Sequence, residues 1–195
     1  SPAPGEHDRV NVDGALAVSV GTLNLGTVCT TSPGHEIAGT TTISGTINLG
    51  TSIGTASVDV TVNAGGTLRM EGSASAKPIL RMANGKSIAV NGTFATTITG
   101  VSQKPRITST SDTGPPSAAC GATYGFTAGA TGGTLDVDGL DFRCANASGL
   151  TLGANLATFT RMNRVDFKFV NGTDPRHLRV LRSTANYTFD SNTFD

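Results

Sequence analysis

The sequence predicts an all-β chain folded as a right-handed parallel β-helix, a solenoid with coils of about 20–25 residues. Three observations predict this class. The 195 residues include 25 Gly and few charged residues, and they are rich in Thr, Ser, Ala and Val. This composition favours strands and turns over helices. In addition, one short segment recurs at regular spacing, and within each copy apolar and polar residues alternate as they do along a strand.

The recurring segment sets the length of the coil. GTLNLGT at 21–27 returns as GTINLGT at 45–51, a degenerate copy GTLRMEG lies at 66–72, and KSIAVNG at 86–92 reads as a fourth. A spacing of roughly 20–24 residues is typical of a solenoid, in which each repeat buries its apolar face only by stacking on its neighbours. We therefore expect one copy in each coil.

Alternation within the copies predicts which side chains face the core. Leu23 and Leu25 share one face of their strand, and the equivalent apolar pairs of the later copies repeat that choice. Stacking should place these pairs in apolar columns. The hydroxyl residues that precede them should form an outward column. Its expected members are Thr22, Thr46, Thr67 and Ser87.

The second half of the chain alternates in the same way. TLDVDGLDFR at 134–143 alternates as Leu135 and Val137, then as Leu140 and Phe142, and NRVDFKF at 163–169 places apolar residues at every second position. Val165 follows Leu140 by one coil length. Between the halves, a stretch rich in Pro, Gly and Ser predicts a loop inserted near 109–121.

Domain boundaries follow from these assignments. Residues 1–13 are predicted to form an N-terminal cap or an extended segment, and residues 14–195 to form the β-helix repeats. The closing NYTFDSNTFD stops where a coil should continue. Because an uncovered end coil exposes strand edges, we expect the chain to belong to a longer protein, truncated here at the C-terminus.

Charge and hydropathy restrict the partners. Fourteen basic and fourteen acidic residues balance, which argues against nucleic acid as a partner. No apolar stretch is long enough to span a membrane. The partners we expect are glycans or other copies or segments of the same surface protein, in an extracellular or cell-surface location.

Several phrases carry a resemblance to a known class of proteins. VNAGGTLRMEG, KSIAVNGTF and QKPRITSTS resemble a phrase found in bacterial surface β-helices, and FTRMNRVDF and YTFDSNTFD are similar to rungs of pectate-lyase-like right-handed β-helices. The resemblance covers roughly residues 40–195. It implies a fold much more strongly than an activity, because this class includes lyases, hydrolases, adhesins and stalk modules.

The cysteines suggest one disulfide. Cys120 and Cys144 are one coil length apart, and equivalent positions on adjacent coils lie about 4.8 Å apart, within the range that a disulfide spans. The alternative is that both are small buried core residues. Cys29 is left unpaired. The spacing of the three cysteines fits no zinc site.

Carboxylates are the candidate catalytic residues. Asp136, Asp138 and Asp141 crowd one coil and by alternation should face solvent, and Asp166 should lie one coil beyond Asp141. The resemblance implies that a hydrolase would use such acids on adjacent coils. It also implies that a lyase would hold Ca²⁺ with carboxylates and use a basic residue. The basic residues in register are Arg143, Arg164 and Lys168.

The competing interpretation is a solvated outer face on which opposite charges alternate across coils. We therefore expect an extracellular structural or adhesive β-helix module with no catalytic residue, no metal site and no cofactor. The alternative is a polysaccharide lyase or glycoside hydrolase that acts on acidic glycans, with Ca²⁺ as its possible cofactor. Ice binding by the hydroxyl column is a third idea, weakened by the changing repeat length and the inserted loop, which should interrupt that column.

Overall fold

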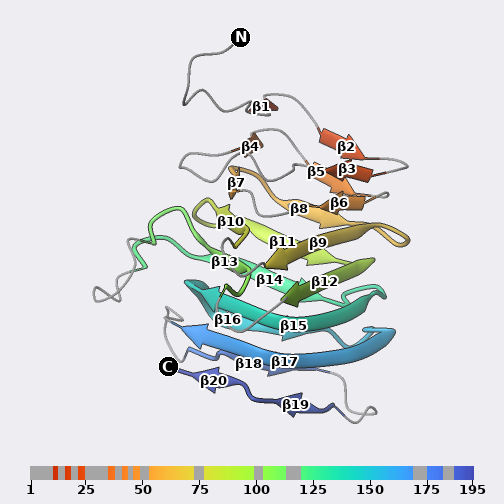
Figure 1. Cartoon of the computed structure of the whole chain (residues 1–195), viewed down its shortest axis with the longest axis vertical. Helices are drawn as coiled ribbons and strands as arrows, with labels where there is room; N and C mark the ends of the chain where they lie inside the picture. Colours follow the sequence, from red (N-terminus) through yellow and green to blue (C-terminus); the bar gives the residue numbers. More distant parts are fainter. Residues whose placement is uncertain are drawn as a thin grey trace.

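The computed structural model describes the backbone of residues 11–12, 16–18, 22–24, 35–37, 41–43, 46–48, 53–72, 77–98, 103–112, 120–168, 175–181 and 187–195. Every regular element in this part of the chain is a β-strand, and the strands stack along the long axis from β1 to β20 (Figure 1). All pairs between the described strands are parallel, so the predicted parallel β-helix is confirmed. No helix in the described residues could cross a membrane.

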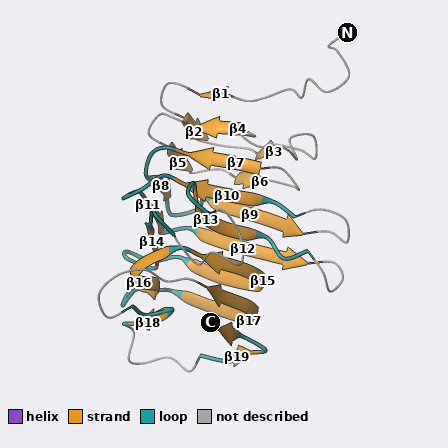
Figure 2. Cartoon of the chain, turned by 90° about the vertical axis from the view of Figure 1, so that its left-hand side faces the viewer, coloured by secondary structure: helices purple, strands orange, loops and turns teal. Residues whose placement is uncertain are grey.

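Three faces form the solenoid, and each coil contributes a strand to each face (Figure 2). The first face contains β2 (Leu16–Val18), β5 (Thr41–Ile43), β8 (Val60–Val62), β11 (Ser87–Val90), β14 (Tyr124–Ala128), β16 (Ala145–Leu152) and β18 (Leu178–Val180). The second contains β3 (Thr22–Asn24), β6 (Thr46–Asn48), β9 (Thr67–Gly72), β12 (Thr93–Ile98) and β19 (Phe189–Asp190). The third contains β1 (Asn11–Val12), β4 (His35–Ile37), β7 (Ile53–Ala56), β10 (Ile79–Met82), β13 (Arg106–Ser109) and β20 (Thr193–Phe194).

Two long strands join the second face to the third. β15 (Thr134–Arg143) and β17 (Thr158–Lys168) begin on the second face and end on the third, so that these two faces form one 13-stranded sheet. The predicted loop near 109–121 falls between β13 and β14, and residues 113–119 of it lie outside the described part. Residues 1–10, most of the predicted cap, also lie outside it.

Threonines stack in a column along the edge of the second face at which its strands begin. Its members are successive Cα partners on adjacent coils: Thr22, Thr46, Thr67, Thr93, Thr134 and Thr158. The prediction that Ser87 is the fourth member is wrong, because Ser87 lies on the first face, where its partner is Gly125. KSIAVNG alternates like the other copies, and alternation cannot distinguish one face of a solenoid from another.

The threonine column is also not interrupted where the repeat length changes. Thr93 and Thr134 are direct partners although the inserted loop separates them in sequence. In sequence, the extra residues fall in the connection between β13 and β14, which are not strands of the second face. A solenoid tolerates such insertions because only the strands, and not the connections, must stay in register.

The core lies between the three faces and is built from apolar columns. The inward residues predicted for 134–143 are Leu135, Val137, Leu140 and Phe142, and all four are fully buried. Leu68, Met70, Ile88 and Val90 are buried as predicted. Aromatic rings continue from coil to coil with edge-to-face contacts, of which Phe126 with Phe142 and Phe142 with Phe167 are examples.

A one-residue corner turns the chain from the second face to the third. Gly139 occupies it in β15 with a φ of 78°, and Arg164 occupies the equivalent position in β17 with a φ of 57°. In this left-handed conformation the strand bends and its side chains resume alternation on the new face. The Thr96 hydroxyl of the previous coil donates a hydrogen bond to the Gly139 carbonyl at 2.9 Å, which holds the bend. Asp141 thereby reaches the third face.

Polar side chains tie neighbouring coils together at the other corners. The Asp59 carboxylate accepts hydrogen bonds from the Ser87 amide at 2.7 Å and the Ser87 hydroxyl at 2.9 Å. The Asn91 side-chain oxygen accepts one from the Thr131 amide at 3.1 Å. Backbone amides at these corners that lack a partner in a neighbouring strand donate their hydrogen bonds to side-chain oxygens in this way. Asp and Asn are therefore expected at these positions.

Candidate functional site

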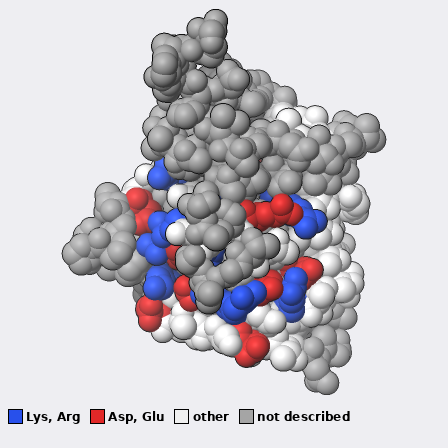
Figure 3. Space-filling model, viewed as in Figure 1, with Lys and Arg blue, Asp and Glu red and all other residues white. Residues whose placement is uncertain are grey.

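The predicted catalytic residues lie on the outer surface of β15, β17 and the strands beside them. Acidic and basic side chains intermingle there, over the lower part of the face that Figure 3 presents. They separate into two groups. The second-face group contains Asp136, Asp138, Arg161 and Arg164. The third-face group contains Lys104, Arg106, Asp141, Arg143, Asp166, Lys168 and Asp195.

The second-face group links β15 to β17. Arg161 donates from Nε to Asp136 at 2.6 Å and from Nη1 to Asp138 at 3.1 Å. Arg164 donates to Asp138 from Nε at 2.8 Å and from Nη2 at 2.6 Å. The hydrogen bond with Asp136 is the main cause that raises the pKa of Arg161 above its ordinary value. Both carboxylates of this group, Asp136 and Asp138, therefore contact a guanidinium of the next coil.

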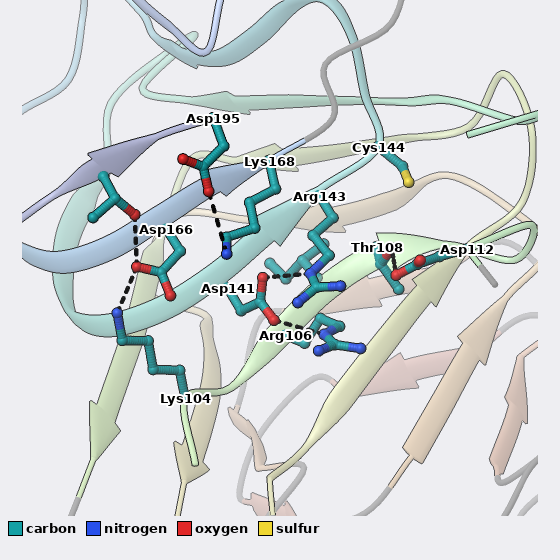
Figure 4. A network of polar contacts seen from close by, with 12 residues as sticks. Lys104, Arg106, Thr108, Asp112, Asp141, Arg143, Cys144, Asp166, Lys168 and Asp195 are labelled. Carbon is teal, nitrogen blue, oxygen red and sulfur yellow. Dashed lines mark hydrogen bonds and ion pairs between the residues drawn. The ribbon is translucent and has the colours of Figure 1, made fainter. Parts of the chain in front are cut away.

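Asp141 is the centre of the third-face group (Figure 4). Its two carboxylate oxygens accept hydrogen bonds from Nε of Arg106 at 2.8 Å and from Nε of Arg143 at 2.6 Å. Only 6% of Asp141 is exposed, so the prediction that it faces solvent is wrong. The corner at Gly139 turns Asp141 outward on the third face, where Arg106 and Arg143 lie on either side of its carboxylate.

A further cation lies near this cluster. Burial lowers the pKa of the Lys77 ammonium, and the positive charges of Arg106 and Arg143 lower it further. Asp141 and Asp112 act in the opposite direction. At this point of the third face, the three cationic side chains of Lys77, Arg106 and Arg143 thus carry more charge than Asp141 alone can compensate.

Asp166 lies one coil beyond Asp141, as predicted, and is its direct Cα partner. Its carboxylate accepts hydrogen bonds from the Lys104 ammonium at 2.7 Å and the Thr193 hydroxyl at 2.8 Å (Figure 4). Burial by itself would raise the pKa of Asp166, but these hydrogen bonds and the charges of Lys104 and Lys168 outweigh it and lower the pKa. The carboxylate is therefore ionised at neutral pH, which suits an ion-pair partner and not a proton donor.

The structure brings together only part of the predicted set. Asp136, Asp138 and Arg164 lie on the second face, whereas Asp141, Asp166 and Lys168 lie on the third. Lys168 contacts Asp195 at 3.3 Å. A catalytic role for these six residues stays a prediction. Among the described residues, no group of three or more His, Cys, Asp or Glu could hold a metal ion, and calcium binding also stays a prediction.

Sequence reasoning missed three cations of the two groups. Arg161 could have been found, because it lies one coil from Asp136, the length already assigned to the repeat. Lys104 and Arg106 precede the inserted loop, and the distance in sequence from Arg106 to Asp141 matches no repeat length. Only the three-dimensional register places that pair together.

The predicted disulfide between Cys120 and Cys144 is present. The two sulfur atoms are 2.01 Å apart and the two Cα atoms 5.3 Å apart. Cys144 forms the whole connection between β15 and β16, and it follows Arg143 of the third-face group. The disulfide therefore fastens the end of the inserted loop beside the buried ion pair. Cys29 lies outside the described residues, and its free state stays a prediction.

The part of the inserted loop that precedes the disulfide is fixed to the solenoid by hydrogen bonds. The Thr108 hydroxyl donates to the Asp112 carboxylate, and the Ala122 amide donates to the Ser111 hydroxyl, each at 2.7 Å. The buried Tyr124 hydroxyl donates to the Ile107 carbonyl at 3.2 Å. These contacts connect both ends of the loop to the coil that carries Arg106.

Comparisons with known proteins complete the description of the site. No family model, curated protein or solved structure gives a significant match to the chain. The parallel β-helix therefore rests on the structure itself, and the similarity to bacterial surface and pectate-lyase-like β-helices stays a resemblance of short sequence phrases.

Replacing Asp141 by Asn should destabilise the protein. The substitution leaves the buried guanidinium of Arg143 and the partly buried one of Arg106 without their shared anion, which should cost about 3–5 kcal/mol of unfolding free energy. The control is Glu71→Gln, because Glu71 pairs with Arg69 where both side chains are over 40% exposed, and loss of an exposed pair costs about 0–1 kcal/mol. Chemical denaturation of both variants checks this, and equal losses would contradict the assignment of Asp141 as a buried anchor.

Removing the disulfide should also destabilise the protein. With both cysteines replaced by Ser, we expect a loss of about 2–4 kcal/mol, because the unfolded chain is no longer cross-linked. A reducing agent should shift the denaturation curve of the wild type but not that of the variant. Peptide mass spectrometry without reduction should join Cys120 to Cys144. A peptide that joins Cys29 to either residue within one chain would show that the pairing is wrong.

Proposed function

We propose that this chain is a structural or adhesive β-helix module of a larger secreted or cell-surface protein. One observation carries the proposal: the acidic side chains that could serve catalysis are instead paired with cations, mostly from an adjacent coil. Asp136 and Asp138 join β15 to β17 through arginines, and Asp141 joins β15 to β13. The outer charges therefore link adjacent coils to one another.

The geometry gives less support to a glycan-cleaving enzyme. A hydrolase needs one carboxylic acid with a raised pKa and a second carboxylate across the scissile bond. The pKa of Asp166 is lowered, and Asp141, its neighbour, already accepts hydrogen bonds from two arginines. The remaining two acidic candidates lie on a different face of the solenoid.

The energetics also suit a scaffold. Apolar columns that run through the coils whose side chains the structure describes supply most of the stability, at about 1.5–3 kcal/mol for each large buried side chain. Partly exposed ion pairs contribute little individually, but they fix which residues of adjacent coils lie side by side. A charge pattern of this kind favours correct register over maximal stability, which is what a long repetitive module requires.

The disulfide supports a location outside the reducing cytosol. Disulfides persist in secreted and surface proteins and are rare in cytosolic ones. The bridge between Cys120 and Cys144 is buried and fastens the end of the inserted loop to the residue that follows β15. Such a position fits a structural bridge that is formed once and then retained.

The threonine column offers a surface for adhesion. It runs along the second face with one hydroxyl residue in each coil, from Thr22 to Thr158. Hydroxyl groups that repeat at the spacing of parallel strands, about 4.8 Å, can hold an extended glycan by many modest hydrogen bonds. The module would therefore bind such a chain along its axis without changing it chemically.

The purified protein should show no turnover of pectate, alginate or related acidic glycans, with or without Ca²⁺. Release of unsaturated or reducing ends over many hours is the measurement, and Asp166→Asn is the informative variant because Asp166 is more exposed than Asp141. Asp141→Ala is unsuitable, since loss of its buried charge should destabilise the protein and a loss of turnover could then not be assigned to catalysis. Turnover that Asp166→Asn or Asp138→Asn abolished, at an unchanged melting temperature, would refute the scaffold proposal.

A further inference from the structure

Among the described residues of the third face, none forms an ion pair with the Lys77 ammonium. Lys77 lies two residues before β10, and its half-buried side chain faces outward like that of Ile79, because the residue between them is buried. Lys77 also forms no hydrogen bond within the described part of the chain. The segments 73–76, 99–102 and 113–119, which flank β10 and β13 in sequence, contain no Asp or Glu that could supply a partner.

Comparison with the equivalent lysine of the next coil explains why Lys77 is left over. Lys77 and Lys104 occupy equivalent positions, because the strands that follow them pair directly. Lys104 forms its ion pair with Asp166, two coils further along the solenoid. The carboxylate two coils from Lys77 is that of Asp141, and both of its oxygens already accept hydrogen bonds from arginines.

The surroundings of Lys77 carry positive charge. Burial is the largest cause that lowers the pKa of its ammonium, and the positive charge of Arg106 is the next. Arg143 lowers the pKa further, while Asp141 and Asp112 offset these effects only in part. Because several cations share few carboxylates here, the local potential attracts an anion.

Arg106 has hydrogen-bond donors that are not in use. Its Nε contacts Asp141 at 2.8 Å, whereas its Nη1 and Nη2 form no hydrogen bond within the described part of the chain. The guanidinium extends away from Asp141 beyond Nε (Figure 4). A guanidinium can donate two parallel hydrogen bonds to one oxyanion. Since Asp141 already holds this guanidinium in place, less side-chain entropy is lost when an anion binds.

We propose that Lys77 and Arg106 bind a phosphate or sulfate group on the third face, with Arg143 adding positive charge. A tetrahedral anion has oxygens for both cations, because two can accept hydrogen bonds from the guanidinium and a third from the ammonium. A carboxylate has only two oxygens and is less well matched to this pair. The bound group is either a free inorganic ion or an ester carried by a polymer. This site goes beyond the scaffold proposal and does not depend on it.

Titration calorimetry of the whole chain with inorganic phosphate and with sulfate, at constant ionic strength, tests the site. The wild type should bind one anion saturably. Lys77→Gln should weaken binding about ten- to a hundredfold, because a charge-assisted hydrogen bond is lost. Lys77→Arg keeps the charge and should retain binding. The matched control is Lys86→Gln, which removes a half-buried lysine just before β11 and should bind like the wild type.

Melting temperatures give an independent measurement and check that each variant is folded. Without added anion, Lys77→Gln should melt no lower than the wild type, because the substitution breaks no ion pair. Phosphate and sulfate stabilise folded proteins in general, since they are excluded from protein surfaces. The wild type and Lys86→Gln should show a larger shift than Lys77→Gln, because binding adds to that background. Equal shifts in all three proteins, or acetate binding as tight as phosphate binding, would overturn the proposal.

A phosphate monoester, glucose 6-phosphate, distinguishes the two sources of the anion. If it binds at least as tightly as inorganic phosphate, the site accepts a phosphate group carried by a glycan. If it binds about tenfold more weakly, the site holds the free ion. Either result supports the site, whereas a wild type that binds neither phosphate, sulfate nor the ester contradicts it. That failure would leave the scaffold proposal intact, because the turnover assay tests the scaffold proposal separately.

Discussion

The constraint on which the rest of the structure depends is the parallel, in-register stacking of one coil on the next. Each residue lies about 4.8 Å from its equivalent in the adjacent coil, so that side chains of one kind accumulate in columns. Apolar columns fill the core and the threonine column lines the second face. The same rule places Asp141 directly beside Asp166. Two neighbouring carboxylates repel each other, and this repulsion explains why Arg106, Arg143 and Lys104 surround them.

The stacking of the coils therefore accounts for the arrangement of the charged side chains, independently of any functional site. Catalysis would need carboxylates with distinct environments that hold one of them protonated. Here the cations keep Asp166 ionised, and of the two arginines that bind Asp141, Arg106 comes from the adjacent coil and Arg143 from the same strand. The disulfide at Cys144 closes the inserted loop next to this ion pair. These features favour a scaffold whose outer charges preserve the register between coils.

The sequence predicted the features that depend on local periodicity and on the coil length. It did not predict which face a strand joins, or which residues meet across the inserted loop. Alternation identified the inward residues of 134–143, and coil length paired Cys120 with Cys144 and Asp141 with Asp166. The prediction that Ser87 belongs to the threonine column was wrong, because strands of the first and second faces show the same alternation of apolar and polar residues. The prediction that Asp141 is solvated was also wrong, since the bend at Gly139 and the contact with Arg106 arise only when the third face is assembled.

Register across the long inserted loop is the central claim, and a distance between spin labels tests it most directly. With Cys29 replaced by Ser, labels on cysteines at positions 67 and 134 should lie on one column two coil steps apart, so that their Cα atoms are about 10 Å from each other. Electron paramagnetic resonance should then show strong dipolar broadening. A separation beyond about 20 Å, four or more such steps, would contradict the stacked column and the solenoid built on it.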